Sequence, residues 1–376
     1  MDRALARLAE SPATPAARPG VLTLDAIGHV FGATRALDDV DLTIAAGELV
    51  AILGPSGCGK STLLRIIAGL LRPQSGRVII DGLDVTALPA NQRSVGIVFQ
   101  SYALFPHMTA AANVGYGLRA RGERRGMIAE RVAEMLALVR MGELAARYPA
   151  QLSGGQQQRV AFARTLAVKP GILLLDEPFA ALDRGLRLDM QIEVKRLQRS
   201  LGITTILVTH DQEEALSLAD RVMVLNQGRV EQIAAADEVY ERPASPFVAG
   251  FVGTTNVLKG QLASVPGGGF SVALDGGGTL ALDAAHPCSR AGHVLLAVRP
   301  EQLAIAPDAA VAGPITGTVR VVLPLGPNLV VEVALPDGSA LKVGLARNAL
   351  KLGHLSPGQP VTVGLVPGER PAVFAA

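Results

Sequence analysis

Three glycines, a lysine and two hydroxyl side chains stand close together in the first quarter of the sequence. The segment reads Gly54, Pro55, Ser56, Gly57, Cys58, Gly59, Lys60 and Ser61. Glycines let successive backbone N–H groups wrap a polyphosphate, the lysine adds a point charge, and the last hydroxyl can ligate Mg²⁺. An apolar run precedes the segment and the helix-like Thr62–Leu70 follows it, as a phosphate-binding loop requires. The pattern therefore predicts a site for a nucleoside triphosphate with Mg²⁺, the alternative being a chance glycine-rich turn.

Two adjacent acids end an apolar run farther along the chain. Ile172–Leu175 is followed by Asp176 and Glu177. A buried strand here would deliver Asp176 beside the metal ion, and Glu177 would orient and polarise an attacking water. Apolar runs that end in two acids are common, so the pattern gains its weight from the glycine-rich segment upstream.

A serine and two glycines lie between these groups, in the run Ser153, Gly154, Gly155 and Gln156. Ser153 is a typical N-cap and predicts a helix that continues through Arg164. The two glycines would expose the backbone N–H groups, so that the positive end of the helix can face a γ-phosphate. In isolation the run would be interpreted only as a helix cap. Its place between the other two patterns favours a role in binding the phosphates.

In this order the three patterns resemble the ATP-binding cassette (ABC) ATPases, over about residues 21–239. The resemblance implies that Lys60, Ser61 and Thr62 contact the phosphates and Mg²⁺. It also implies that Asp176 and Glu177 are the Walker B pair. We call Gly54–Ser61 the P-loop and Ser153–Gln156 the signature segment.

Further residues match positions of that family. Gln100, after the strand-like Val95–Phe99, matches the Q-loop glutamine, which contacts the metal, the attacking water and the membrane partner. Asp183 matches the D-loop aspartate, His210 matches the switch histidine, and Phe31 falls where an aromatic ring stacks on adenine. The resemblance thus implies the Mg²⁺ ligands Ser61, Gln100 and Asp176 and the catalytic residues Glu177, His210 and Gln100.

The same resemblance implies a homodimer. The signature segment of one copy would complete the ATP site that the P-loop of the other copy begins, so a single copy lacks half of each site. Departures from the family pattern are slight: Ala180 stands where many relatives carry Ser or Gly, and Phe31 lacks the hydroxyl of the usual Tyr.

Short apolar runs that alternate with helix-like stretches must position these residues. Leu49–Leu53, Val95–Phe99, Ile172–Leu175 and Thr204–Val208 are dense in Val, Ile and Leu, as buried parallel strands are. We expect an α/β P-loop NTPase fold over residues 21–243, with a helical insertion over about 101–165 that lacks strand signals.

Residues 244–376 have a different character. Glycine-rich turns separate short runs typical of β-strands, which predicts an all-β domain, barrel-like or sandwich-like, with two β modules as an alternative. The runs are Val257–Val265, Phe270–Leu274, Val294–Val298, Val319–Leu323, Val330–Leu335 and Val361–Val366. Val298–Glu301 resembles a motif of the OB-like accessory (TOBE) domain of importer ATPases, although an inert dimerisation domain remains an alternative.

The importer resemblance implies partners and a place. Ser101–Thr109 resembles the stretch that receives a membrane subunit, so we expect two permease subunits and, indirectly, an extracytoplasmic solute-binding protein, at the cytoplasmic face of the inner membrane. Asp189–Glu193 and Phe251–Leu258 look most like the spermidine/putrescine branch, with 2-aminoethylphosphonate, ferric iron, sulfate and sugar importers as alternatives. A soluble, non-transport ABC ATPase is the alternative of another class.

Composition further limits the classes of protein to which this chain can belong. The 376 residues include 49% hydrophobic and 18% charged residues, so a sizeable core can form, yet no apolar run approaches the ~18–20 residues of a membrane helix. The net charge of +2 argues against a nucleic-acid surface. Cys58 and Cys288 form no disulfide framework, which fits a reducing compartment. Residues 1–20 lack an apolar signal region, and we expect them to be disordered.

Overall fold

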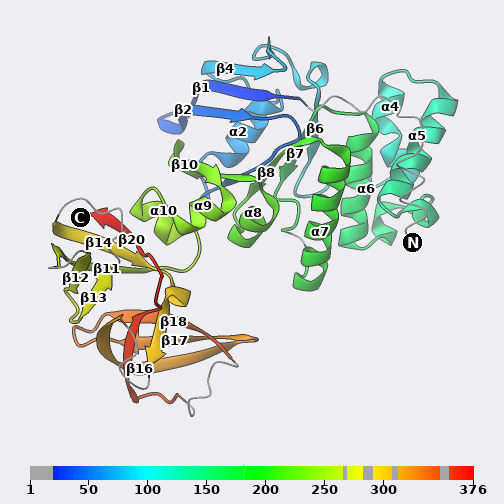
Figure 1. The fold of residues 1–376 in the computed structure, drawn as a ribbon. Helices are drawn as coiled ribbons and strands as arrows, with labels where there is room; N and C mark the ends of the chain where they lie inside the picture. The colour runs from blue at the N-terminus through cyan, green and yellow to red at the C-terminus, as the bar shows by residue number, and fades with distance from the viewer. Residues whose placement is uncertain (1–19, 181, 266–268, 283–290, 307–311, 348–354) are drawn as a thin grey trace. The chain divides into compact units, whose positions relative to one another are not determined.

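The computed structural model describes residues 20–180, 182–265, 269–282, 291–306, 312–347 and 355–376. Residues 1–19 of the expected disordered extension, Ala181 before the D-loop aspartate, and Cys288 lie outside these ranges. The chain divides into two compact units, of which the first ends at Ala236 and the second begins at Asp237 (Figure 1). The domain boundary expected after residue 243 falls inside the second unit and stays a prediction.

A mostly parallel sheet forms the centre of the first unit. Its strands, in spatial order, are β10 (Arg229–Ala235), β9 (Arg221–Asn226), β3 (Leu49–Leu53), β8 (Thr204–Thr209), β7 (Ile172–Asp176) and β6 (Val95–Val98). Only the β9–β10 hairpin is antiparallel. The strands predicted from apolar runs are confirmed, because β3 and β8 are buried along their whole length.

A second, antiparallel sheet covers this core and was not predicted. It consists of β2 (Thr34–Ile44), β1 (Leu22–Phe31), β4 (Ser75–Ile80) and β5 (Leu83–Asp84). Its buried side chains, such as Leu24 and Val78, share one hydrophobic core with Ile52 of β3 and Ile66 of helix α2 (Lys60–Ile67). The two sheets and α2 therefore form one packed body that fixes where β3 ends.

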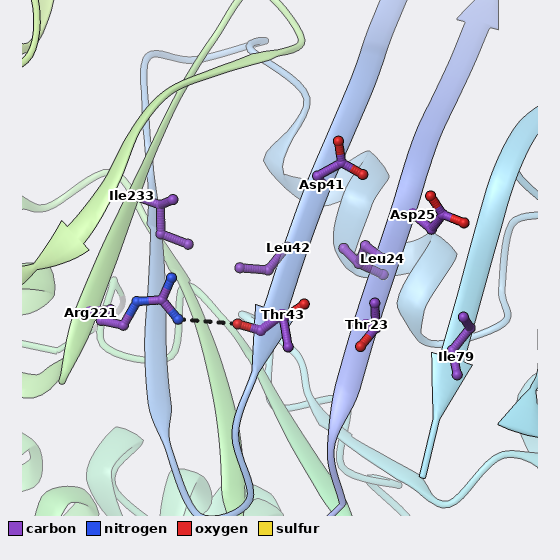
Figure 2. Close-up of a pocket in the computed structure, with 9 residues that line it drawn as sticks. All are labelled: Thr23, Leu24, Asp25, Asp41, Leu42, Thr43, Ile79, Arg221 and Ile233. Atoms are coloured by element: carbon purple, nitrogen blue, oxygen red, sulfur yellow. Dashed lines mark hydrogen bonds between the residues drawn. The ribbon is translucent and has the colours of Figure 1, made fainter. Parts of the chain in front are cut away.

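A groove of about 350 Å³ lies over this antiparallel sheet, as Figure 2 shows. Its lining residues are Thr23, Leu24, Asp25, Asp41, Leu42, Thr43, Ile79, Arg221 and Ile233. The Asp25 carboxylate accepts hydrogen bonds from Arg77, and Asp41 accepts one from the backbone N–H of Ala26 at 2.8 Å. Since both carboxylates already have protein partners, we assign no function to this groove.

Helices make up the expected insertion. Residues 101–165, all of which the structure describes, contain no strand. Their α-helices are α3 (Ala110–Val114), α4 (Tyr116–Ala120), α5 (Arg125–Leu138) and α6 (Gly154–Ala167), the last of which extends two residues beyond this stretch. Helices α4 and α5 pack against α6 (Figure 1), and α7 (Arg184–Leu201) and α8 (Gln212–Leu218) follow. No helix among the described residues is long and apolar enough to cross a membrane.

The described part of the second unit contains two short helices and two five-stranded antiparallel sheets. The helices are α9 (Ala236–Glu241) and α10 (Pro246–Phe251). The first sheet contains, in spatial order, β13 (Thr279–Leu282), β12 (Phe270–Leu274), β11 (Asn256–Ser264), β14 (Gly292–Val298) and β20 (Ala372–Ala375). The second contains β15 (Leu303–Ala306), β19 (Pro360–Leu365), β16 (Ala312–Leu325), β17 (Asn328–Ala334) and β18 (Ala340–Ala346). Buried side chains from both sheets, such as Leu296 and Val331, form a single core. The predicted all-β architecture is confirmed.

Arg299, from the motif that suggested an accessory domain, fastens the helical segment of the second unit to its sheets. Arg299 is 6% exposed, and its guanidinium donates to the carbonyls of Tyr240, Ala249 and Val252 and to the Thr255 hydroxyl. It also lies over the Tyr240 ring, 4.2 Å from its centroid. Burial lowers the pKa of Arg299, a cost that these charge-assisted bonds offset.

Replacing Arg299 by Leu should destabilise the second unit by about 3 kcal/mol, because several buried carbonyls would lose their donor at once. Calorimetric unfolding measures the change. Arg320→Leu, which removes an exposed ion pair with Glu332 in the same unit, is the matched control and should cost under about 0.5 kcal/mol. Equal effects of the two variants would contradict this role of Arg299.

Candidate nucleotide-binding site

The P-loop is a tight turn that glycine alone can form at two positions. Gly59 has φ 112°, and a Cβ there would lie 2.3 Å from the carbonyl oxygen of Ala36. A Cβ on Gly54 would lie 2.2 Å from the carbonyl oxygen of Leu225. The backbone of the loop is therefore pressed against β2 and β9, and its amide groups belong to a rigid turn between β3 and α2.

Lys60 crosses its own loop. The side chain is 6% exposed, and Nζ donates to the carbonyls of Gly54 at 2.7 Å and Pro55 at 2.9 Å. The N-terminus of α2 has no side-chain cap, so its first N–H groups are donors for an anion. Ser56, Gly57 and Ser61 are exposed at this end, while Cys58 is buried and its burial raises the pKa of the thiol.

The register of the parallel strands brings the other predicted residues to the same edge. Leu53, before the P-loop, pairs with Thr209, and Val208 pairs with Asp176. Val98, two residues before Gln100, pairs with Leu175. Since the carboxyl ends of neighbouring parallel strands meet at one edge, Gln100, Asp176, Glu177 and His210 gather beside the P-loop.

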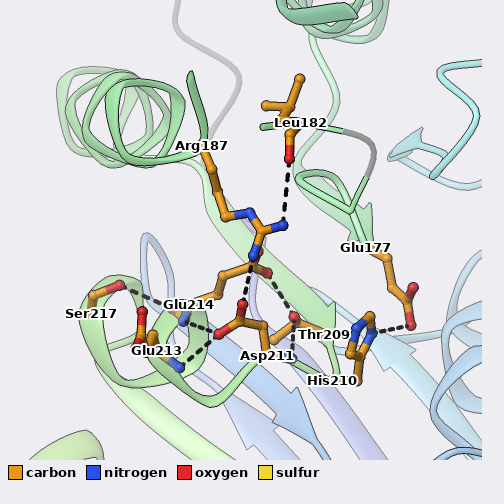
Figure 3. A network of polar contacts seen from close by, with 9 residues as sticks. All are labelled: Glu177, Leu182, Arg187, Thr209, His210, Asp211, Glu213, Glu214 and Ser217. Carbon is orange, nitrogen blue, oxygen red and sulfur yellow. Dashed lines mark hydrogen bonds and ion pairs between the residues drawn. The ribbon is translucent and has the colours of Figure 1, made fainter. Parts of the chain in front are cut away.

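Glu177 and His210 contact each other. Glu177 Oε1 lies 3.1 Å from His210 Nδ1, as Figure 3 shows. The backbone of Glu177 is left-handed, with φ 44°, and its N–H donates to the carbonyl of Val208. A non-glycine residue in this conformation is strained, which is common in functional sites. Glu177 is 23% exposed and His210 is 59% exposed, so the pair faces the open edge of the sheet.

The residues at this edge fit Mg²⁺. Ser61, Gln100 and Asp176 offer hydroxyl, amide and carboxylate oxygens, which are the hard ligands that Mg²⁺ prefers. Burial, and then the neighbouring Glu177 charge, raise the pKa of Asp176, while Lys60 and Arg65 oppose the shift. Among the described residues no cluster of three or more His, Cys, Asp or Glu side chains stands ready for a metal.

The signature segment begins α6 as predicted. Ser153 Oγ accepts from the N–H of Gln156 at 3.4 Å, and Gln156 Oε1 accepts from the N–H of Ser153 at 3.0 Å. A Cβ on Gly154 would lie 3.6 Å from Leu182 Cδ2, so the start of α6 adjoins the D-loop. No hydrogen bond or ion pair between described residues joins this segment to the P-loop of the same chain.

Asp183 and Phe31 are accessible. Asp183 caps α7, with Oδ1 accepting from the N–H of Leu186 at 3.0 Å. Phe31 is 52% exposed, and its ring meets the His29 ring edge-on with centroids 4.5 Å apart. An exposed, braced aromatic ring suits stacking on a base.

Several polar residues near this edge were not singled out from the sequence. Arg187 pairs with Asp211 at 3.0 Å, and Thr209 donates to the buried Glu214 at 2.6 Å (Figure 3). Burial raises the pKa of Glu214. These pairs were missed because contacts between distant residues leave no local pattern in the sequence. The only signal was that Asp211 directly follows His210.

Known proteins and family models match most of this chain. A family model described as ABC transporter matches residues 37–180, and a TOBE domain model matches residues 296–369. The sulfate/thiosulfate import ATP-binding protein of Burkholderia mallei is 50% identical over 336 residues, which are 88% of this chain and 93% of that protein. This chain belongs to the ABC transporter family. As an ABC ATPase of the import type it hydrolyses ATP with Mg²⁺, and its predicted family and fold class are confirmed.

Other relatives of this ABC ATPase are named for different solutes. The spermidine/putrescine import ATP-binding protein of Frankia alni is 50% identical over 326 residues, 83% of this chain and 69% of that protein. The Fe(3+) ions import ATP-binding protein of Rhizobium meliloti is 46% identical over 325 residues, 86% and 91% of the two chains. All three names describe import, so the non-transport alternative gains no support, while the solute is not resolved.

A solved structure shares the ATPase fold. It is the dimeric post-hydrolysis state of the ATP-binding cassette MJ0796 bound to ADP and Pi. The TM-score is 0.51 at 36% identity, and the match covers 57% of this chain and 98% of that one.

Proposed function

We propose that this ATPase works as a homodimer that couples ATP hydrolysis to solute import, bound peripherally to two permease subunits at the cytoplasmic face of the inner membrane. An extracytoplasmic solute-binding protein would deliver the solute. The Glu177–His210 contact supports the proposal, because it holds a carboxylate and its partner beside the P-loop, where hydrolysis would require them. The dimeric state of the MJ0796 cassette supports the homodimer.

The residues at the edge divide the work. Phe31 stacks on adenine, and the amides of the P-loop with Lys60 and Thr62 hold the phosphates. Ser61, Gln100 and Asp176 would hold Mg²⁺, which would neutralise phosphate charge when bound. Lys60 now donates to two loop carbonyls, and an arriving phosphate would compete for the same ammonium group.

Glu177 orients the attacking water and accepts its proton, and His210 fixes the carboxylate that does so. Glu177 has a left-handed backbone directly after β7, and its carboxylate lies 3.1 Å from His210. Hydrolysis of this kind depends mainly on positioning and electrostatic stabilisation.

The second copy supplies what this chain does not bring to its own P-loop. Ser153 caps the start of α6, where Gly154 is exposed. Asp183 directly follows Leu182, whose side chain lies against Gly154. We propose that these residues close on the nucleotide held by the partner copy, so that ATP joins the two copies and hydrolysis releases them.

A cavity of about 240 Å³ next to the segment after Gln100 supports a docking place for the permease. Phe105, Tyr116 and Arg164 line it, and the Phe105 and Tyr116 rings lie 4.4 Å apart. Arg164 donates to the carbonyl of Ala103 at 2.7 Å, which ties this cavity to the backbone near Gln100. A short apolar segment of a permease would pack against these two rings, which are in contact with each other.

For the solute we propose a polyamine, spermidine or putrescine. The local likeness of Asp189–Glu193 and Phe251–Leu258 to that branch supports it, as does the 50% identity with the Frankia alni protein. Sulfate or thiosulfate is the second candidate, because the Burkholderia mallei protein is equally identical.

Replacing Glu177 by Gln should leave ATP binding intact and lower turnover by about 10²–10⁴-fold, since the amide cannot accept the proton of the attacking water. Steady-state ATPase assays and nucleotide titration measure the two effects. Glu213→Gln, on the exposed side of α8, is the matched control and should keep wild-type turnover. Substantial turnover by Glu177→Gln would refute this role.

The solute is best tested on a secreted solute-binding protein, if one is encoded beside the gene for this chain. We expect calorimetric titration to show tight binding of spermidine or putrescine and none of sulfate, thiosulfate or ferric iron. Tight sulfate binding with no polyamine binding would overturn the polyamine assignment and leave the ATPase proposal untouched.

A further inference from the structure

One guanidinium joins the D-loop to the segment that carries His210. Arg187, in the first turn of α7, places Nη1 3.0 Å from Asp211 Oδ2 (Figure 3). Its Nη2 donates over a long 3.5 Å to the carbonyl of Leu182. Nε is buried and has no acceptor among the described protein atoms. The side chain therefore joins two separate loops.

The Asp211 end of this contact is firmly attached to the switch segment. Asp211 Oδ1 accepts from the N–H groups of Glu213 at 2.9 Å and Glu214 at 3.2 Å, and so caps α8. The N–H of Asp211 donates to Thr209 Oγ1 at 3.0 Å. Because His210 lies between these two anchored residues, a displacement of Asp211 would also displace the partner of Glu177.

The Leu182 end adjoins the surface that the partner copy would meet. Leu182 is 6% exposed, and its side chain lies against Gly154 at the start of α6. Asp183 follows it directly and caps α7. Arg187 thus contacts the carbonyl of Leu182, a residue whose side chain packs on the signature segment and which directly precedes the D-loop aspartate.

We propose that Arg187 is a positioning residue that keeps the D-loop and the start of α6 in register with the Glu177–His210 pair. Through this contact, a change in the Glu177–His210 arrangement changes the positions of the D-loop and the start of α6, which the second copy would contact. The inference rests on the proposed homodimer. The long contact to Leu182, at 3.5 Å, favours a device with a second arrangement.

A double-mutant cycle tests the coupling. Arg187→Met removes the cation, and Asp211→Asn removes the anion but keeps a side chain that caps α8. We expect each variant to lower kcat by about ten-fold while KM for ATP changes less than about two-fold. The double variant should lose no more than the worse single one, since both remove one interaction. Arg187→Lys should recover part of the rate.

Assembly provides the second readout. In the Glu177→Gln background, light scattering follows ATP-dependent dimerisation. Arg187→Met should weaken the dimer by about ten-fold. Lys195→Met is the matched control, because Lys195 is on the same helix as Arg187 but pairs with Asp220 at 3.1 Å, away from the D-loop. That control should dimerise as its parent does.

Additive losses in the cycle, or unaltered dimerisation of Arg187→Met, would overturn the inference while leaving the proposed function intact. If Glu177→Gln alone stays monomeric with ATP, the proposed homodimer fails and the inference falls with it. Should Arg187→Met not fold, Asp211→Asn in the Glu177→Gln background decides the question by the same dimerisation measurement.

Discussion

The close approach of the P-loop backbone to two neighbouring strands is the constraint on which the rest of the site depends. Gly54 lies against the carbonyl of Leu225 and Gly59 against that of Ala36, with no room for a side chain. The turn is therefore rigid before any nucleotide arrives, and Lys60 is held across it by loop carbonyls. A preformed ring of donors avoids the reorganisation that a flexible loop would need when it binds a polyanion.

The parallel sheet extends this constraint to the chemistry. Because β3, β8, β7 and β6 lie in register, a fixed P-loop also fixes where Asp176, Glu177, His210 and Gln100 stand. The electrostatics agree with a site built for a cation and a phosphate chain. Two adjacent carboxylates, one half-buried with a raised pKa, repel each other, and Mg²⁺ would relieve that repulsion.

Sequence patterns revealed those parts of the molecule whose physics is local. The P-loop, the Ser153 cap and the strand before Asp176 each follow from neighbouring residues, and each was predicted with nearly correct bounds. The antiparallel sheet was missed because bulges interrupt the alternation of β1 between Leu24 and Val30. Short strands such as β15 left too few residues for a pattern. The Arg187–Asp211 contact joins residues 24 positions apart, and only the fold brings them together.

Mixing two inactive variants tests most directly whether each ATP site is shared between two copies. Lys60→Ala disables the P-loop of one copy, and Ser153→Arg blocks the signature segment of the other. A mixed dimer of the two retains one complete site, formed by the P-loop of the second variant and the signature segment of the first. The account predicts that ATPase activity, absent from either variant alone, returns when they are combined and exchange subunits. Activity that stays at the level of the separate variants, although exchange is demonstrated, would contradict it.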